Sequence, residues 1–386
     1  MSLDWIDDEL KEFEARGLYR SLRRVNSRQG PVIELDGQEV INFSSNDYLG
    51  LAADPRLGRA AHSAALRWGA GAGSSRLIAG NLALFTELEA ELAGFVGTES
   101  CLVFTSGYHG NLGLIPALAG KNDVIFSDRL NHASVIDGCR LSRARVAIYE
   151  HRDLDHLERL LKEHGQARRK LVVSEGLFSM DGDLAPLPGL IETAKRAGAM
   201  IVIDDAHALG VLGPHGRGSL DHFGIPATEV DALLGTLGKA LGSSGAFVCG
   251  QERLVKHLVN RGRTFVFTTG PSPLAAAAAL ESLRICMEEP WRRDRALAHA
   301  GRIRDGLCGM GRPTDDCPGA IVPVILGEPG TAMTACRRLI ERGLFVQGIR
   351  PPTVPEGTAR LRISASAGHT PEQVDRLLEG LKEVVG

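Results

Sequence analysis

Residues 200–207 of the chain read MIVIDDAH, a short apolar run that ends in two acids and a histidine. Four consecutive apolar residues are typical of a strand that is covered on both faces, as in a parallel sheet wrapped by helices. The acid at position 204 would then lie at the carboxyl end of that strand, where open α/β sheets bind their ligands. This stretch therefore predicts both the fold class and the place of the chemistry.

Similar apolar runs alternate with helical patterns on both sides of this stretch, which predicts an α/β fold with a mainly parallel central sheet wrapped by helices. The opening residues look helical, with Ile6, Leu10 and Phe13 on one stripe, and a hairpin turned by Asp36 and Gly37 follows them. The strands expected in the central sheet are 101–104, 124–127, 145–149, 170–174, 200–204, 232–236 and 246–249.

The pattern changes after about residue 285 to long helices with fewer, separated strands, expected at 320–326, 344–347 and 359–364. We therefore expect a large domain over residues 46–285 and a smaller α+β domain over residues 286–386. The N-terminal segment, residues 1–45 with the hairpin strands 32–35 and 40–43, is expected to pack with the small domain.

Composition is that of an ordinary globular protein, with 44% hydrophobic and 24% charged residues. A net charge of -3 provides no basic field for a nucleic acid. The longest apolar run, 274–280, is too short to span a bilayer. Seven scattered cysteines and an acidic, amphipathic start unlike a leader favour reduced thiols in the cytoplasm.

A carboxylate buried at Asp204 needs a cationic partner or dense hydrogen bonding. A protonated pyridine nitrogen is one such partner, and the pairing would strengthen a pyridoxal ring as an electron sink. Two alternatives remain open on these residues alone. Asp204, Asp205 and His207 could ligate a metal, although neighbouring strand residues point to opposite faces. Asp204 could also be a structural acid.

A single lysine follows the next buried strand, within the segment GTLGKALGSSG at 235–245. Glycines allow a bulky cofactor to approach the backbone, and Thr236 offers a hydroxyl to a phosphate. A partly desolvated lysine at position 239 can act as an amine nucleophile and form a Schiff base. Most lone lysines in glycine-rich loops are solvated, so the argument depends on the spacing of this lysine from Asp204 and His207.

Two further strand ends carry candidate residues. In FTSGYHGN (104–111) a strand ends in a glycine turn and a helix begins, which makes a possible phosphate site at Gly107 and Tyr108. In NHAS (131–134) His132 stands at a helix start, where a histidine is commonly a cap but could stack on a planar ring. Two other motifs are discounted: residues 69–73 follow a helical pattern rather than a strand, and residues 181–192 lack EF-hand ligands.

Taken together, these segments resemble the α-oxoamine synthases, a branch of the fold-type I pyridoxal-phosphate enzymes, over nearly the whole chain. The resemblance rests on NDYLGL (46–51), SGY (106–108), NHAS (131–134), DDAH (204–207) and TLGKALG (236–242).

The resemblance implies pyridoxal 5'-phosphate as cofactor and an enzyme that works as a homodimer. Lys239 would hold the cofactor and shuttle the substrate's α-proton, Asp204 would pair with the pyridine nitrogen, and His207 would bond the ring oxygen. The further cofactor residues it implies are His132, stacked on the ring, with Gly107, Tyr108, Ser179 and Thr236 around the phosphate and ring, and Thr268 and Thr269 approaching the phosphate of the second subunit.

Within this family, GSSRLI (73–78), LFSMDGDLAPL (177–187) and IRPPTVP (349–355) favour an acyltransferase that joins L-alanine to a pimeloyl thioester in biotin biosynthesis. The acyl carrier would be coenzyme A or a carrier protein. Arg362 would grip the amino-acid carboxylate, as a bidentate guanidinium can. Arg20, Asn46, His132 and Thr353 would help to place the substrate.

One departure from the family pattern is His109-Gly110, beside the phosphate turn. The alternatives are a sister enzyme such as glycine C-acetyltransferase, an aminotransferase on the same fold, and a binding protein that has kept the fold. The last is disfavoured because the lysine, the aspartate and both histidines are present.

Overall fold

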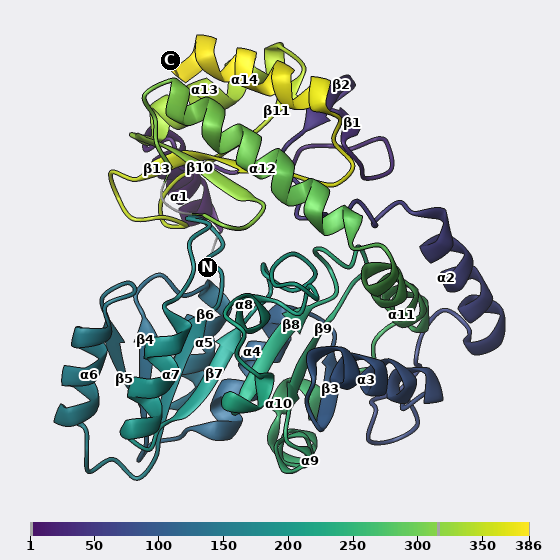
Figure 1. Cartoon of the computed structure of the whole chain (residues 1–386), viewed down its shortest axis with the longest axis vertical. Coiled ribbons are helices and arrows are strands. Elements are labelled where there is room, and N and C mark those ends of the chain that lie inside the picture. Colours follow the sequence, from purple (N-terminus) through teal and green to yellow (C-terminus); the bar gives the residue numbers. More distant parts are fainter. Residues whose placement is uncertain (1–2, 315–316, 386) are drawn as a thin grey trace. The chain divides into compact units, whose positions relative to one another are not determined.

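The computed structural model describes residues 3–314 and 317–385, and their contacts divide them into two compact units (Figure 1). The larger unit comprises Asn46–Ser179 and Asp183–Asp294. The smaller unit comprises the described residues up to Ser45, those from Arg295 onward, and Met180–Gly182.

A seven-stranded sheet forms the centre of the larger unit, in the order β3-β9-β8-β7-β6-β4-β5. Strands β4 to β8 run parallel to one another, whereas β9 lies antiparallel between β3 and β8. The strands are β3 (Ser100–Phe104), β4 (Val124–Asp128), β5 (Arg145–Tyr149), β6 (Lys170–Glu175), β7 (Met200–Asp204), β8 (Ala232–Thr236) and β9 (Ala246–Gly250).

Helices cover both faces of this sheet. On one face, α4, α5, α9 and α10 contribute to a core with strand residues such as Ile125, Val173 and Val202. Helices α6 and α7 contact each other and strands β4, β5 and β7. The helices of this unit are α2 (Pro55–Trp68), α3 (Ala83–Val96), α4 (Gly107–Leu118), α5 (Ala133–Ser142), α6 (Leu154–Glu163), α7 (Leu187–Arg196), α8 (Ser219–His222), η1 (Ala227–Glu229), α9 (Glu252–Arg261), α10 (Arg263–Val266) and α11 (Pro273–Glu288).

The strand order changes direction between β4 and β6. From β4 the chain crosses outward to the edge strand β5, and from β6 it crosses the other way to β7. The loops after β4 and β6 therefore diverge, and such a switch point opens a crevice at the carboxyl edge of a parallel sheet. His132 follows β4 and Ser179 follows β6, so both lie in loops at this edge.

Two three-stranded sheets and three long helices make up most of the smaller unit. The sheets are β1-β2-β11 and β10-β13-β12. A shared core includes Phe43, Ile303, Val322, Leu361 and Leu377. The elements are α1 (Asp4–Ala15), β1 (Val32–Leu35), β2 (Gln38–Asn42), α12 (Trp291–Gly309, which begins in the larger unit), β10 (Ile321–Gly327), α13 (Pro329–Glu341), β11 (Leu344–Phe345), β12 (Gln347–Ile349), β13 (Ala359–Ser364) and α14 (Pro371–Val385).

The single strand predicted at 344–347 is wrong, because two strands occupy this stretch. Strand β11 pairs in parallel with β2, and β12 pairs antiparallel with β13. The buried Val346 separates them, so the chain passes from one sheet to the other at this residue. No helix among the described residues is both long and apolar enough to span a bilayer.

Candidate active site

Lys239 lies three residues beyond β8, at the carboxyl edge of the sheet, and its Nζ is 2.7 Å from Nε2 of His207. Nδ1 of His207 is 2.7 Å from the hydroxyl of Tyr48, which donates its proton to Oδ1 of Asn46 at 3.1 Å. Because a tyrosine has one hydroxyl proton, Nδ1–H of His207 donates to Tyr48, and Nε2 accepts from Lys239. This chain of contacts sets the histidine tautomer and directs the lysine nitrogen.

Asp204 ends β7, and its carboxylate is buried. Oδ2 accepts from Nδ2 of Asn111 at 2.6 Å, and Oδ1 accepts from the N–H of Ala206 at 3.1 Å. Within the described residues, neither a lysine nor an arginine forms an ion pair with Asp204. A buried carboxylate with only neutral donors is costly unless a cation joins it, so the position suits a positively charged ligand.

His132 caps the start of α5 and connects to Asp204 through two side chains. The N–H of Ser134 donates to Nδ1 of His132 at 3.2 Å, and Oγ of Ser134 lies 2.8 Å from the same nitrogen. Asn111 donates to Oγ of Ser134 at 2.9 Å as well as to Asp204. Burial lowers the pKa of His132. The charge of Asp204 acts to raise this pKa, and the charge of Lys239 acts to lower it further. The ring is therefore neutral at physiological pH.

Two buried acids at this edge were not singled out from the sequence as cofactor residues. Glu175 ends β6, and Asp205 follows Asp204. Burial raises the pKa of Asp205 to about 7, and burial with the nearby charge of Asp204 raises the pKa of Glu175 to about 8. Among the described atoms, Oε1 of Glu175 and Oδ1 of Asp205 have no hydrogen-bond partner. Perturbed acids in a crevice are a common mark of functional sites.

The remaining predicted cofactor residues are Ser179, Thr236 and the first two residues of α4, Gly107 and Tyr108. The N–H of Ser179 donates to Oε2 of Glu175 at 3.1 Å. Oγ1 of Thr236 donates to the carbonyl of Gly245 at 3.1 Å. Gly107 and Tyr108 open α4, where first-turn N–H groups have no carbonyl of a preceding turn to donate to.

The side chains of Tyr108 and the three metal candidates have different partners. The hydroxyl of Tyr108 donates to Asp137, so only its backbone is available at the turn. The Asp205 carboxylate accepts from the N–H of Ser219, whereas Asp204 and His207 turn to the partners described above. The three residues of the alternative metal interpretation, Asp204, Asp205 and His207, therefore each contact different partners and do not converge on one point.

Arg20, Thr353 and Arg362 belong to the smaller unit. Arg20 and Thr353 line a groove of about 470 Å³ with Arg23 and Arg350. Arg362 is buried on β13 and donates to Oγ of Ser364 at 2.8 Å. Asn46, by contrast, joins the Lys239 chain of the larger unit through Tyr48.

Three residues of the site were missed as such from the sequence. Glu175 carries the same signal as Asp204, an acid at the end of an apolar run, but the predicted strand stopped one residue short of it. Tyr48 stands inside the quoted motif NDYLGL without an assigned role. Asn111 lies in the interior of α4, and no sequence pattern separates it from an ordinary helix residue.

Comparisons with known proteins identify the family and the fold of the chain. Residues 38–381 match the model of the aminotransferase class I and II family, so the chain belongs to that family. Its fold is that of the fold-type I pyridoxal-phosphate enzymes, which confirms the predicted fold class.

Similar full-length relatives are 8-amino-7-oxononanoate synthases, and the chain is a member of this synthase group. The relative from Anaeromyxobacter sp. (strain Fw109-5) is 55% identical over 99% of this chain and 96% of its own length. The relative from Geobacter sulfurreducens is 49% identical over 98% and 97%. The resemblance to the α-oxoamine synthases is thereby confirmed.

Solved structures show the same fold. Serine palmitoyltransferase from S. paucimobilis, with a bound PLP–myriocin adduct, has a TM-score of 0.94 at 32% identity and covers 100% of this chain and 98% of its own. The 8-amino-7-oxononanoate synthase from Francisella tularensis has a TM-score of 0.78 at 28% identity, covering 89% and 97%.

Proposed function

We propose that this chain uses pyridoxal 5'-phosphate to condense L-alanine with a pimeloyl thioester. The products would be 8-amino-7-oxononanoate, carbon dioxide and free thiol, and the reaction would be a step of biotin biosynthesis. The observation that carries the proposal is one lysine, Lys239, at the same sheet edge as a buried carboxylate, Asp204, that has only neutral donors. The full-length synthase relatives support the choice of reaction.

The residues at the crevice fit this cofactor. Asp204 would hold the proton on the pyridine nitrogen, which supplies the cation that the buried carboxylate lacks. The first-turn N–H groups of Gly107 and Tyr108 suit a phosphate at a helix N-terminus. Thr236 and Ser179 contribute further polar groups, and the neutral ring of His132 suits stacking on a planar heterocycle.

When bound, the cofactor supplies an electron sink for negative charge at the α-carbon of the amino acid. Lys239 would hold the cofactor's aldehyde carbon until the substrate's amine displaces it, and the freed amine of Lys239 would then remove and return the α-proton of the substrate. His207 accepts from Lys239 in the structure and would bond the ring oxygen, with Tyr48 maintaining its tautomer.

Substrate placement is proposed for the residues that the family resemblance implies. Arg362 would bind the alanine carboxylate through two parallel hydrogen bonds, and Arg20, Asn46, His132 and Thr353 would orient the substrates. The acyl carrier is coenzyme A or an acyl carrier protein, and the experiment below includes both.

A cytoplasmic homodimer is part of the proposal. Ile78 and Phe267 are large apolar side chains with exposed fractions of 81% and 72%, and Phe267 directly precedes Thr268 and Thr269 in the sequence. Side chains of this kind are commonly buried in a protein interface when they form a contiguous patch. Light scattering during size-exclusion chromatography would measure the mass of the assembly and so distinguish a dimer from a monomer.

The test is thiol release by the purified, cofactor-loaded chain, with alanine, glycine or serine crossed against pimeloyl, acetyl and succinyl thioesters. Each acyl group is supplied on coenzyme A and, for pimeloyl, also on a carrier protein. Pyruvate is measured in parallel, because an aminotransferase would release a keto acid and no thiol.

Release confined to alanine with pimeloyl thioester is the expected result. Release with glycine and a short acyl group would move the chain to a sister acyltransferase. Pyruvate without thiol release would replace the proposal with an aminotransferase. If neither thiol nor pyruvate formed, the proposed acyl-transfer reaction itself would be overturned.

A further inference from the structure

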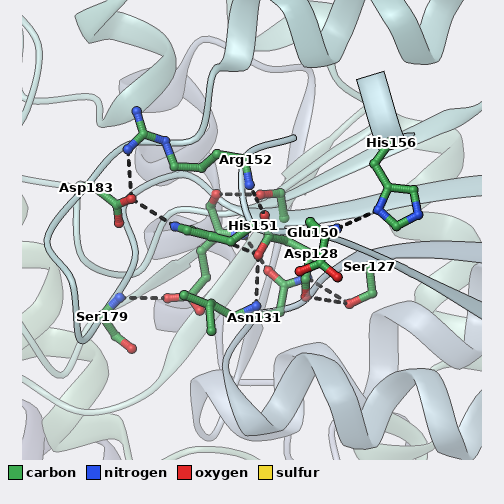
Figure 2. Close-up of polar contacts among 12 residues, drawn as sticks. Ser127, Asp128, Asn131, Glu150, His151, Arg152, His156, Ser179 and Asp183 are labelled. Atoms are coloured by element: carbon green, nitrogen blue, oxygen red, sulfur yellow. Dashed lines mark hydrogen bonds and ion pairs between the residues drawn. The ribbon is translucent and has the colours of Figure 1, made fainter. Parts of the chain in front are cut away.

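Three successive loops leave the carboxyl edge of the larger unit's sheet after β4, β5 and β6. The first carries His132 and the third carries Ser179, both proposed to surround the cofactor. The second carries His151, to which neither the motifs nor the proposed reaction assigns a role. Figure 2 shows His151 between the other two loops, joined to each by a hydrogen bond.

Both ring nitrogens of His151 contact a carboxylate. Nδ1 lies 2.9 Å from Oδ1 of Asp128, and Nε2 lies 2.9 Å from Oδ2 of Asp183. Carboxylates only accept hydrogen bonds, so both nitrogens donate when the ring is doubly protonated. Burial opposes this charge, but the hydrogen bonds to Asp128 and Asp183 outweigh it and raise the pKa of His151 to about 9. The ring is therefore an imidazolium at neutral pH.

Asp128, at the end of β4, is firmly attached to the loop that leads to His132. Its Oδ1 accepts from the N–H of Leu130 at 2.8 Å, and its backbone carbonyl accepts from the N–H of Asn131 at 3.2 Å. Asn131 then donates to the carbonyl of Val173 on β6 at 2.9 Å. A contact to the Asp128 carboxylate therefore acts directly on the backbone just before His132.

Asp183 is attached in the same way to the loop that carries Ser179. Its carbonyl accepts from the N–H of Phe178 at 2.9 Å, beside a bridge between Leu177 and Leu184. The ring of Phe178 meets the His151 imidazole edge-on, with the ring centroids 4.4 Å apart. The imidazole thus contacts this loop through a charge and through an aromatic ring.

The neighbouring Arg152 cannot replace this bridge. The guanidinium of Arg152 donates to Asp183 at 3.0 Å. Arg152 contacts Asp128 only through its backbone N–H, which also donates at 3.0 Å. Its side chain is 44% exposed, against 22% for His151, so solvent weakens its ion pair more. Of the side chains described here, the imidazole of His151 alone contacts both carboxylates.

We propose that His151 is a positioning residue, which sets the spacing between the His132 loop and the Ser179 loop by bridging Asp128 and Asp183. It acts through these loops and touches neither the cofactor nor the substrates. The inference rests on the proposed function only in assigning His132 and Ser179 to the cofactor site. Without the bridge, the two buried carboxylates of Asp128 and Asp183 would carry like charges with no imidazolium between them.

The test compares wild type with His151→Asn, which removes the charge and keeps one donor group. His156→Asn is the matched control, because His156 lies on α6 just beyond this loop and accepts from the Glu150 N–H without contacting either carboxylate. In the cofactor-free proteins, hydrogen exchange of the Phe178 and Ser179 amides is measured. Affinity for pyridoxal phosphate is then measured from the absorbance of the lysine-bound cofactor.

We expect His151→Asn to speed exchange of both amides and to weaken cofactor binding by about tenfold, since it removes a charge-assisted hydrogen bond. In loaded enzyme kcat should fall, with KM for alanine within about twofold of wild type. His156→Asn should match wild type in every measurement. Unchanged exchange and unchanged affinity in His151→Asn would overturn the proposal.

A pH series separates positioning by charge from simple packing. The charged groups facing His151 are Asp128, Asp183 and, through Asp183, Arg152. Because folding raises the pKa of His151 above its unfolded value, its stabilisation is complete below about pH 6.5 and is lost as pH rises through about 9. The Tm gap between wild type and His151→Asn should therefore close over this range, and a constant gap would contradict the charge bridge.

Asp183→Asn provides a second path if His151→Asn folds poorly. Both variants break the same contact, so combining them should add little to either alone, whereas full additivity would refute the bridge. Wild type that loads cofactor but releases no thiol would defeat the proposed function, and the exchange and affinity comparisons would still decide the role of His151.

Discussion

Buried carboxylates lie at both ends of the strands of the seven-stranded sheet, and Asp123 at the amino end is satisfied differently from Glu175 and Asp205 at the carboxyl end. At the amino end, Asp123 precedes β4 and accepts from Nε and Nη2 of Arg168 at 2.9 and 3.0 Å and from the N–H of Gly120 at 2.8 Å. Burial acts against it, yet Arg168 and Gly120 hold its pKa below the usual value. At the carboxyl end, burial raises the pKa of Glu175 and Asp205.

This difference distinguishes a structural acid from one kept for a ligand. Asp123 has enough donors to hold its charge in the folded chain. Glu175 and Asp205 each leave one oxygen without a hydrogen-bond partner, and Asp204 has only neutral donors. Burial alone is therefore a poor guide to function. The stronger signal is a buried acid that forms no ion pair, because Asp183 at the same edge also leaves one oxygen without a hydrogen-bond partner but is paired with His151 and Arg152.

The largest effect is expected at Lys239. Lys239→Ala removes the amine that would bind the cofactor and move the α-proton, so thiol release should fall by about 10³-fold or more. The matched control is Lys121→Ala, an exposed lysine at the amino end of β4. Equal turnover by wild type and Lys239→Ala would remove the chemistry from the carboxyl edge.

The next largest effects compare Asp204 at the carboxyl end with Asp123 at the amino end, each replaced by asparagine and measured for activity and stability. Asp204→Asn should lower thiol release by about 10²-fold, because a neutral amide cannot hold the cation, while the free energy of unfolding changes by less than about 1 kcal/mol. Asp123→Asn should leave thiol release within about twofold and lower the free energy of unfolding by about 1–3 kcal/mol. Urea denaturation of the cofactor-free chains supplies the stabilities. If both variants lost activity equally, the two ends would not differ in role.

Much of the fold follows from the sequence because the central strands are continuous apolar runs. Strand β7 matches its predicted range residue for residue, and β6 differs by one residue at its end. Glu175 occupies that missing position, so a small boundary error concealed a site residue.

Other features depend on contacts that no local pattern encodes. The split between β11 and β12 arises because two different sheets pair with one short stretch around Val346. Asn111 becomes a site residue only when α4 brings its amide to Asp204, which lies 93 residues away in the sequence. Sequence position identifies the acids, and the tertiary fold decides which of them lack partners.

The smallest effect concerns Glu175 and appears as a pH dependence of stability. An acid whose pKa is about 8 when folded and about 4.3 when unfolded binds an extra proton in the folded chain between these values. The folded state therefore loses stability as pH rises from about 4.5 to 8. The side chain of Glu175→Gln does not titrate, so the cofactor-free variant should become more stable than wild type as the pH rises towards 8, with the gap shrinking towards pH 4.5. Thermal unfolding across this range measures it, with Glu99→Gln, a glutamate before the edge strand β3, as the control. A gap that stays constant with pH would show that Glu175 holds its charge in the fold as Asp123 does, and the contrast between the two ends of the sheet would then rest on Asp204 and Asp205.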